Sequence, residues 1–170
     1  MPNTEDGAVF RVAVLTISDA GYKGERKDTS GEVIVKMMSG PGYRLVRREI
    51  VPDESDMIAE KLSEWCDGGE VDVIVTTGGT GLGPRDVTPE TVRRIVDIEV
   101  PGVGEAMRMG TLKHTPMAML SRAVAGVRNG CLIVTLPGSP QGVRECLAVV
   151  APVIPHALEM IRGWRGHPAH

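Results

Sequence analysis

The chain has 170 residues, of which 42% are hydrophobic and 24% charged, which suits one globular domain with its own core. Its formal net charge is −3, so it lacks the basic excess with which proteins bind nucleic acid or anionic membranes in general. Aromatic residues make up only 3%, which argues against a surface that stacks nucleic acid bases.

The first half of the chain alternates between predicted strands and helices. Residues 1–8 are expected to form a flexible tail. The segment FRVAVLTI is mostly apolar, which is typical of a strand covered on both faces. Asp28-Thr29-Ser30 can cap a helix, and Gly40-Pro41-Gly42 ends it. The predicted order is strand, helix, strand and helix, over Phe10–Ile17, Asp28–Met38, Tyr43–Ile50 and Glu54–Cys66.

The second half continues this alternation. Asn129-Gly130 between two apolar segments is a strong signal for a β-hairpin. The last predicted helix contains Pro152 and Pro155 and should kink or divide there. Residues 164–170 are expected to form a second flexible tail. The predicted elements are strand 71–75, helices 91–96 and 103–112, strands 123–127 and 131–136, and helix 141–162.

Alternating strands and helices with short connections predict an α/β protein, built as a single domain over residues 1–170. We expect a three-layer α-β-α arrangement with a mostly parallel sheet and one antiparallel hairpin at its edge. In open sheets of this kind, ligands bind beyond the carboxyl ends of the strands. The loops at that edge are therefore the place to look for a functional site.

The cysteines indicate a reducing compartment. Cys66, Cys131 and Cys146 are widely spaced and form no C-x-x-C pair, which suggests reduced thiols in a cytosolic protein. Cys131 and Cys146 are expected to pack in the core. The first ten residues, MPNTEDGAVF, lack the features of a secretory signal, and no apolar run approaches the length of a membrane span. We therefore expect a soluble, cytoplasmic protein.

A glycine-rich loop follows the predicted strand 71–75 and reads TTGGTGLGPRDVT. Thr88 is expected to be the N-cap of the next helix, with Pro89 at its first position. A strand, a glycine loop and a helix start together place backbone N–H groups at the sheet edge, which suits an anion such as phosphate. The loop is not a P-loop, because no Gly-Lys-Ser/Thr follows, and its glycine spacing misses the dinucleotide fingerprint.

Asp86 lies within this loop, where a bound phosphate would repel a bare carboxylate. A divalent cation between the two groups removes this conflict, and Mg²⁺ prefers such oxygen ligands. Asp53 follows another strand and could share the same ion. Two alternatives stay open, since Asp86 could be a local cap of a glycine-rich turn and Asp53 could cap a helix.

The segment TTGGTGLGPRDVTPE resembles the signature of the MogA/MoaB family of molybdenum cofactor biosynthesis proteins. Three further segments are similar to that family and extend the resemblance over nearly the whole chain: Thr16–Asp19, Val51–Glu54, and Leu120–Arg122 followed by Leu136–Pro140. The MogA-type members of the family are molybdopterin adenylyltransferases. The resemblance implies transfer of AMP from Mg-ATP to the terminal phosphate of molybdopterin, with release of pyrophosphate.

The resemblance also implies roles for individual residues. Asp53 and Asp86 would be the catalytic, Mg²⁺-binding pair. The positions similar to those that bind substrate or nucleotide in the family are Ser18, Asp19, Gly78, Gly79, Thr80, Gly81, Ser121, Pro137 and Gly138. Arg85 either assists or is a surface charge. Thr135 departs from the asparagine that the family often has before Leu-Pro-Gly, so any contact made there must differ.

Two other functions stay open. One is a non-catalytic molybdopterin carrier or scaffold, although a carrier needs no pair of metal-binding carboxylates. The other is the MoaB-type branch of the family, in which the same motifs occur. The resemblance further implies a homotrimer and handover of the product to a molybdate-inserting protein.

Overall fold

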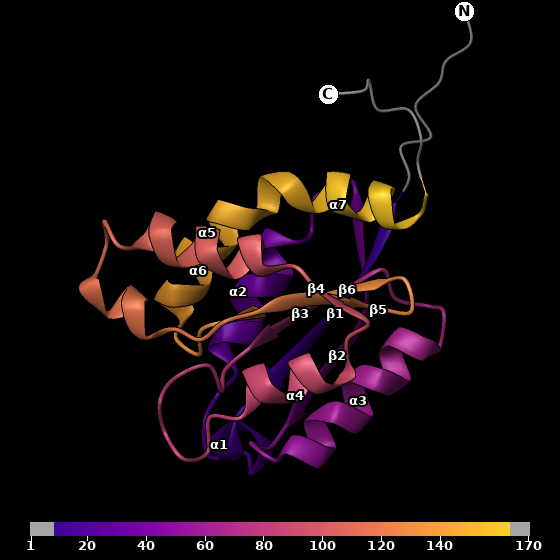
Figure 1. The fold of residues 1–170 in the computed structure, drawn as a ribbon. Helices are drawn as coiled ribbons and strands as arrows, with labels where there is room; N and C mark the ends of the chain where they lie inside the picture. Colours follow the sequence, from indigo (N-terminus) through magenta and orange to yellow (C-terminus); the bar gives the residue numbers. More distant parts are fainter. Residues whose placement is uncertain (1–8, 164–170) are drawn as a thin grey trace, which may run out of the picture.

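The computed structural model describes residues 9–163, and the two predicted tails lie outside these described residues. A six-stranded sheet lies between two layers of helices (Figure 1). The strands are β1 (Phe10–Ile17), β2 (Tyr43–Val51), β3 (Val73–Thr77), β4 (Ile98–Glu99), β5 (Ala125–Arg128) and β6 (Cys131–Leu136). The predicted three-layer α-β-α fold is therefore confirmed.

The sheet order is β2-β1-β3-β6-β5-β4. The pairs among β1, β2, β3 and β6 are parallel, whereas β5 is antiparallel to both β6 and β4. The predicted hairpin between β5 and β6 is confirmed, with Asn129 at φ 46° and Gly130 at φ 79° in its turn. The two-residue strand β4 was not predicted, because two residues are too few to show a periodic pattern.

Nine helical segments surround the sheet within the described residues. They are α1 (Asp19–Tyr22), α2 (Thr29–Met37), α3 (Ser55–Asp67), α4 (Thr88–Ile95), α5 (Pro101–Thr111), η1 (Pro116–Leu120), α6 (Pro140–Val150), η2 (Ala151–Val153) and α7 (Ile154–Ile161). The predicted division near Pro152 and Pro155 is confirmed, because the short 3₁₀ turn η2 separates α6 from α7. No helix among residues 9–163 has both the length and the apolar character to cross a bilayer.

Each face of the sheet has its own hydrophobic core, because successive side chains of a strand point to opposite faces. Val12 and Val14 of β1 pack with α2, α5, α6 and α7. Ala13 and Leu15 pack with α3 and α4 on the other face. Figure 1 shows these two groups of helices on opposite sides of the strands. Burial on both faces explains why β1 is mostly apolar and why β3 carries no charged residue.

All three cysteines are free and buried. Cys66 and Cys131 belong to the core beneath α3 and α4, and Cys146 belongs to the core on the other face. Burial is the largest cause that raises the pKa of Cys146, to about 11. The predicted packing role of Cys131 and Cys146 is confirmed, and such buried thiols are poor nucleophiles.

Asp72 forms an ion cluster at the amino end of β3, away from the glycine loop. Its carboxylate accepts hydrogen bonds from the Arg11 backbone N–H at 2.7 Å and the Arg11 guanidinium at 3.0 Å, and it pairs with Arg162 at 3.0 Å. Burial alone would raise the pKa of Asp72, but these arginine contacts outweigh it and lower the pKa to about 2. The cluster ties the start of β1 to the end of α7.

Replacing Asp72 with Asn should destabilise the fold by about 2 kcal/mol at pH 7. The pKa of Asp72 is depressed in the folded state, so its contribution is present above the unfolded value of 3.8 and is lost as pH falls toward 2. Urea unfolding of wild type and variant at pH 7 and at pH 2.5 tests this. The stability gap should narrow at the lower pH, and a gap of equal size at both would contradict the assignment.

Candidate functional site

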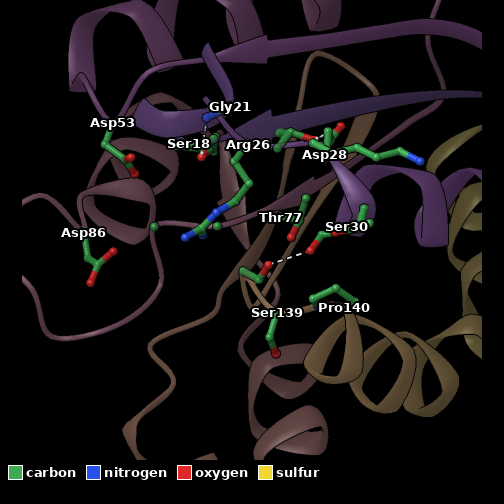
Figure 2. Close-up of a pocket in the computed structure, with 17 residues that line it drawn as sticks. Ser18, Gly21, Arg26, Asp28, Ser30, Asp53, Thr77, Asp86, Ser139 and Pro140 are labelled. Atoms are coloured by element: carbon green, nitrogen blue, oxygen red, sulfur yellow. Dashed lines mark hydrogen bonds between the residues drawn. The ribbon is translucent and has the colours of Figure 1, made fainter. Parts of the chain in front are cut away.

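The loops at the carboxyl edge of the sheet enclose a polar cavity of about 430 Å³ (Figure 2). Four parallel strands contribute their following loops, as predicted from the topology. Of the predicted site residues, the following line this cavity: Ser18, Asp53, Gly78, Gly79, Asp86 and Gly138.

A second cavity of about 410 Å³ adjoins the first and has a more apolar wall that includes Met117, Ala118 and Leu120. The predicted site residues on it are Gly79, Thr80, Gly81, Asp86, Ser121, Pro137 and Gly138. Ser121 precedes β5 and does not follow a parallel strand. It reaches this edge because β5 is antiparallel, so that its amino end lies beside the carboxyl ends of the others. Gly79, Asp86, Gly138 and Ser139 line both cavities.

Positive φ angles shape the glycine loop. Gly78 has φ 104° and Gly79 has φ 70°, values that L side chains rarely adopt. A Cβ atom on Gly78 would lie 2.2 Å from the Ile17 carbonyl oxygen, and one on Gly79 would lie 2.3 Å from Thr88 Oγ1. Only glycine fits at these two positions, because the loop passes close to the end of β1 at Gly78 and close to Thr88 at Gly79.

Thr88 differs from its predicted role. It is the first residue of α4, and Val87 is the N-cap, without a side-chain capping bond. The Thr88 hydroxyl instead donates to the Gly78 carbonyl at 3.0 Å, and its N–H donates to the Gly79 carbonyl at 3.1 Å. The prediction of an N-cap was wrong because this threonine anchors the glycine loop, a contact that no local pattern signals.

Some backbone N–H groups of the glycine loop donate hydrogen bonds within the protein, and others have no acceptor among the described residues. The Gly78 N–H donates to the Leu136 carbonyl at 3.1 Å, so it is not available to an anion. The N–H groups of Gly79, Thr80 and Gly81 make no hydrogen bond to any residue in the range 9–163. These three are the backbone donors that could hold an anion.

Asp86 is held in place through one side of its carboxylate. Its Oδ2 accepts a hydrogen bond from the Gly83 N–H at 2.9 Å, and its backbone carbonyl accepts one from Arg122 Nη2 at 2.8 Å. The bond to Gly83 matches the alternative of a local cap. Its Oδ1 accepts no hydrogen bond within the described part of the chain, and the side chain lines the cavity, so this oxygen is open to a ligand.

Asp53 and Asp19 are joined by a reciprocal pair of hydrogen bonds. The Asp19 N–H donates to Asp53 Oδ2 at 2.9 Å, and the Asp53 N–H donates to Asp19 Oδ1 at 3.0 Å. Glu54, not Asp53, is the N-cap of α3, so the helix-capping alternative for Asp53 is not what the structure shows. The carboxylate of Asp53 instead faces the cavity, on the same side as Asp86 (Figure 2).

The electrostatic setting of Asp53 suits a cation. Burial is the largest cause that raises the pKa of Asp53, and the negative charges of Asp19 and Asp86 raise it further. The N–H group of Asp19 and the charge of Arg85 oppose this shift. A cation placed between Asp53 and Asp86 would relieve the repulsion between two carboxylates that line one cavity.

Arg85 connects the glycine loop to two other loops. Its guanidinium donates to both carboxylate oxygens of Asp19, at 2.9 and 3.0 Å, and to Glu54 Oε1 at 2.8 Å. The hydrogen bonds from Arg85 are the largest cause that lowers the pKa of Asp19. Asp19 lines neither cavity, so these contacts place it beside Asp53 as a support.

Two residues that the sequence did not single out hold the Pro137-Gly138 loop. Ser30 Oγ donates to the Gly138 carbonyl at 2.6 Å, and Thr77 Oγ1 donates to the Pro137 carbonyl at 2.6 Å. Both line the polar cavity. For Thr77, its position at the end of β3 and next to the glycine loop could have indicated a place in the site.

Thr135 bonds within the sheet and lines neither cavity. Its hydroxyl accepts a hydrogen bond from the Val124 N–H and donates to the Val124 carbonyl, each at 2.8 Å. The Thr135 N–H donates to the same carbonyl at 3.1 Å, so the side chain reinforces the pairing just before β5. The Thr135 hydroxyl therefore bonds to the chain itself, and the expectation that any contact made here differs from that of the family asparagine stays a prediction.

The oxygen groups at the site fit Mg²⁺. No cluster of three or more His, Cys, Asp or Glu side chains is poised to hold a metal within residues 9–163. Mg²⁺ is usually bound through one or two carboxylates together with substrate phosphates and water, so a pair of aspartates suffices. Asp53 and Asp86 are the two carboxylates of the cavity that are open to such an ion, since Asp28 is engaged by Thr16 Oγ1, the Gly31 N–H and Arg48.

Comparison with known proteins finds one matching family and several relatives of high identity. Residues 13–156 match the family described as "Probable molybdopterin binding domain". A molybdopterin adenylyltransferase of Helicobacter pylori strain J99 is 45% identical over 91% of this chain and 89% of its own length. The Escherichia coli K12 protein of the same name is 37% identical over 81% of this chain and 72% of its own length.

Solved structures of similar proteins share the fold. The molybdopterin biosynthesis enzyme MoaB of Thermus thermophilus superposes with a TM-score of 0.86, at 51% identity, over 92% of this chain and all of its own. The tungsten cofactor synthesizing protein MoaB of Pyrococcus furiosus superposes with a TM-score of 0.83, at 35% identity, over 91% of this chain and 98% of its own. Adenylyltransferases among the relatives support the prediction of an enzyme. The chain therefore belongs to the molybdopterin-binding family of molybdenum cofactor biosynthesis proteins that includes MogA and MoaB.

Proposed function

We propose that the chain is a molybdopterin adenylyltransferase that transfers AMP from Mg-ATP to the terminal phosphate of molybdopterin. The observation that carries this proposal is that Asp53, Asp86 and the glycine loop line one cavity. The names of relatives that are 45% and 37% identical supply the reaction and its substrates.

Two adjoining cavities suit a reaction between two substrates. Asp86, Gly79 and Gly138 line both, so groups bound on either side would meet there. At this junction a phosphate oxygen of molybdopterin would attack the α-phosphorus of ATP. The bond from that phosphorus to the bridging oxygen would break, and pyrophosphate would leave with the electron pair. Holding both phosphates in line accounts for much of such catalysis.

Charge is the main obstacle, because two polyanions must come together. Mg²⁺ held by Asp53 and Asp86 would supply positive charge at the reacting phosphate. The open N–H groups of Gly79, Thr80 and Gly81 would donate to phosphate oxygens as charge moves onto them. Arg85 would keep the loop that carries Asp86 close to Asp53 through its bonds to Asp19. No nucleophilic side chain is needed, which agrees with the burial of all three cysteines.

Pyrophosphate release from Mg-ATP, measured with and without molybdopterin, tests this function. We expect release only when both substrates and Mg²⁺ are present, and chelation of the metal should stop it. Tight binding of molybdopterin without any release would instead support the carrier alternative.

The homotrimer and the handover to a molybdate-inserting protein stay predictions from the resemblance, and the cytoplasmic location stays a prediction from the cysteines and the N-terminal sequence. Sedimentation analysis of the purified protein would test the first of them.

A further inference from the structure

Arg26 extends into the polar cavity without a partner among the described residues. It lies in the loop between α1 and α2, its side chain is exposed, and it lines the cavity with Asp53 and Asp86. In Figure 2 its guanidinium points between these two carboxylates on one side and Thr77 and Ser139 on the other. Arg26 makes no hydrogen bond and no ion pair with any residue in the range 9–163.

The other basic side chains around the two cavities are engaged. Arg85 pairs with Asp19 and Glu54, Arg122 with Glu90, Arg48 with Asp28, and Lys27 with Glu32 at 3.6 Å. Each of these side chains has an acidic partner that offsets its charge, although the pair of Lys27 with Glu32 is too long for a hydrogen bond. No described residue accepts a hydrogen bond from the guanidinium of Arg26, although the carboxylates of Asp53 and Asp86 line the same cavity.

Because Arg26 has no partner among the described residues, its guanidinium is available to a ligand in the cavity. An arginine that pairs with Asp53 or Asp86 would compete with a metal ion for them, and Arg26 does not pair with either. A planar guanidinium offers parallel N–H groups that match two oxygens of a phosphate. An unpaired guanidinium beside carboxylates and hydroxyl groups is therefore arranged for an anion that arrives from outside.

We propose that Arg26 binds phosphate oxygens of the substrate held in the polar cavity, and that this substrate group is the diphosphate end of the nucleotide. The proposal rests on the proposed function. When the bond from the α-phosphorus to the bridging oxygen breaks, the leaving pyrophosphate gains negative charge, and a Mg²⁺ ion held by Asp53 and Asp86 would offset only part of that charge. Arg26 supplies a second positive charge within the same cavity, on a side chain that the fold leaves free to follow the leaving group.

The sequence did not single out Arg26, because it stands in the charged stretch GERKD. Such a stretch is typical of a solvated loop, and Glu25, Arg26 and Lys27 are all exposed. Only the turn of this loop over the sheet edge brings Arg26, together with Lys27 and Asp28, to the lining of the cavity.

Direct binding of inorganic pyrophosphate with excess Mg²⁺, measured by titration calorimetry, tests the proposal. Arg26→Gln should weaken this binding about tenfold or more, since charge-assisted hydrogen bonds are involved. Arg26→Lys should fall between wild type and Arg26→Gln, because it keeps the charge but not the planar fork. Arg47→Gln is the matched control, since it removes the same charge from a surface pair with Glu70. The control should bind as wild type does.

A second probe separates the two sources of phosphate. Phenyl phosphate presents a single phosphate monoester, as the terminal phosphate of molybdopterin does. A loss confined to pyrophosphate and Mg-ATP supports the nucleotide assignment. A loss confined to phenyl phosphate keeps the phosphate role of Arg26 but overturns its assignment to the nucleotide. Equal binding of every probe by wild type and Arg26→Gln overturns the proposal.

The failure of this proposal can be told apart from failure of the proposed function. Pyrophosphate release at the wild-type rate and half-saturation by Arg26→Gln would overturn the role of Arg26 alone. A wild-type protein that binds pyrophosphate through Arg26 but never releases it from Mg-ATP would overturn the adenylyl transfer alone. Thermal unfolding of both variants checks the fold, which should not change because Arg26 has no polar contact to lose within residues 9–163.

Discussion

Replacing Asp86 with Asn should lower molybdopterin-dependent release of pyrophosphate from Mg-ATP by roughly 10³-fold. The amide oxygen of Asn can still accept the hydrogen bond that the Gly83 N–H gives to Asp86 Oδ2, so the loop should keep its shape. What is lost is the negative charge opposite Asp53, and with it half of the pair that would hold Mg²⁺. Initial rates at saturating substrates measure the effect.

Asp56→Asn is the matched control for this variant. Asp56 has a side chain that is 98% exposed and pairs only loosely with Arg94, at 3.6 Å. The control removes the same charge from α3 without touching either cavity, so it should retain wild-type turnover. Asp86→Asn should also still bind molybdopterin. Turnover by Asp86→Asn close to that of wild type would contradict the role given to this carboxylate.

Replacing Gly78 with Ala should destabilise the protein by about 3 kcal/mol or more. The backbone at Gly78 has φ 104°, and the new methyl group would lie 2.2 Å from the Ile17 carbonyl oxygen. Because a backbone carbonyl of the central sheet cannot turn aside, the glycine loop must move. We therefore expect the melting temperature to fall by about 10 °C for a domain of this size.

Gly40→Ala gives the comparison for Gly78→Ala. A Cβ atom on Gly40 meets nothing within 4 Å, and its φ is not in the positive range. Thermal unfolding of the two variants should separate them clearly, with Gly40→Ala close to wild type. Equal melting temperatures for Gly78→Ala and wild type would mean that the loop adopts another conformation in solution.

The elements of the fold were predictable from the sequence where their signal is local. The apolar runs of β1 and β3 and the Asn129-Gly130 turn each lie within a few consecutive residues. The two prolines that divide the last helix are equally local. Strand β4 lacked such a signal, since its two residues, Ile98 and Glu99, are both exposed.

The supports of the site were not predictable, because they join residues that are distant in the chain. Asp19 and Asp53 bond to each other across 34 positions, and Ser30 reaches Gly138 across 108. No spacing rule covers such separations. The carboxylates themselves could be named, since each follows a strand whose carboxyl end the topology brings to one edge.

Strand order also bears on how the protein is made. β3 is flanked by β1 and β6, but β6 begins only at Cys131, long after β3 has ended at Thr77. During synthesis the edge VIVTT of β3 therefore stays without its second neighbour while α4 and α5 emerge from the ribosome. An exposed edge of this kind is a target for chaperones and a route to aggregation. We expect truncation before β6 to give insoluble protein, even though the first three strands are complete.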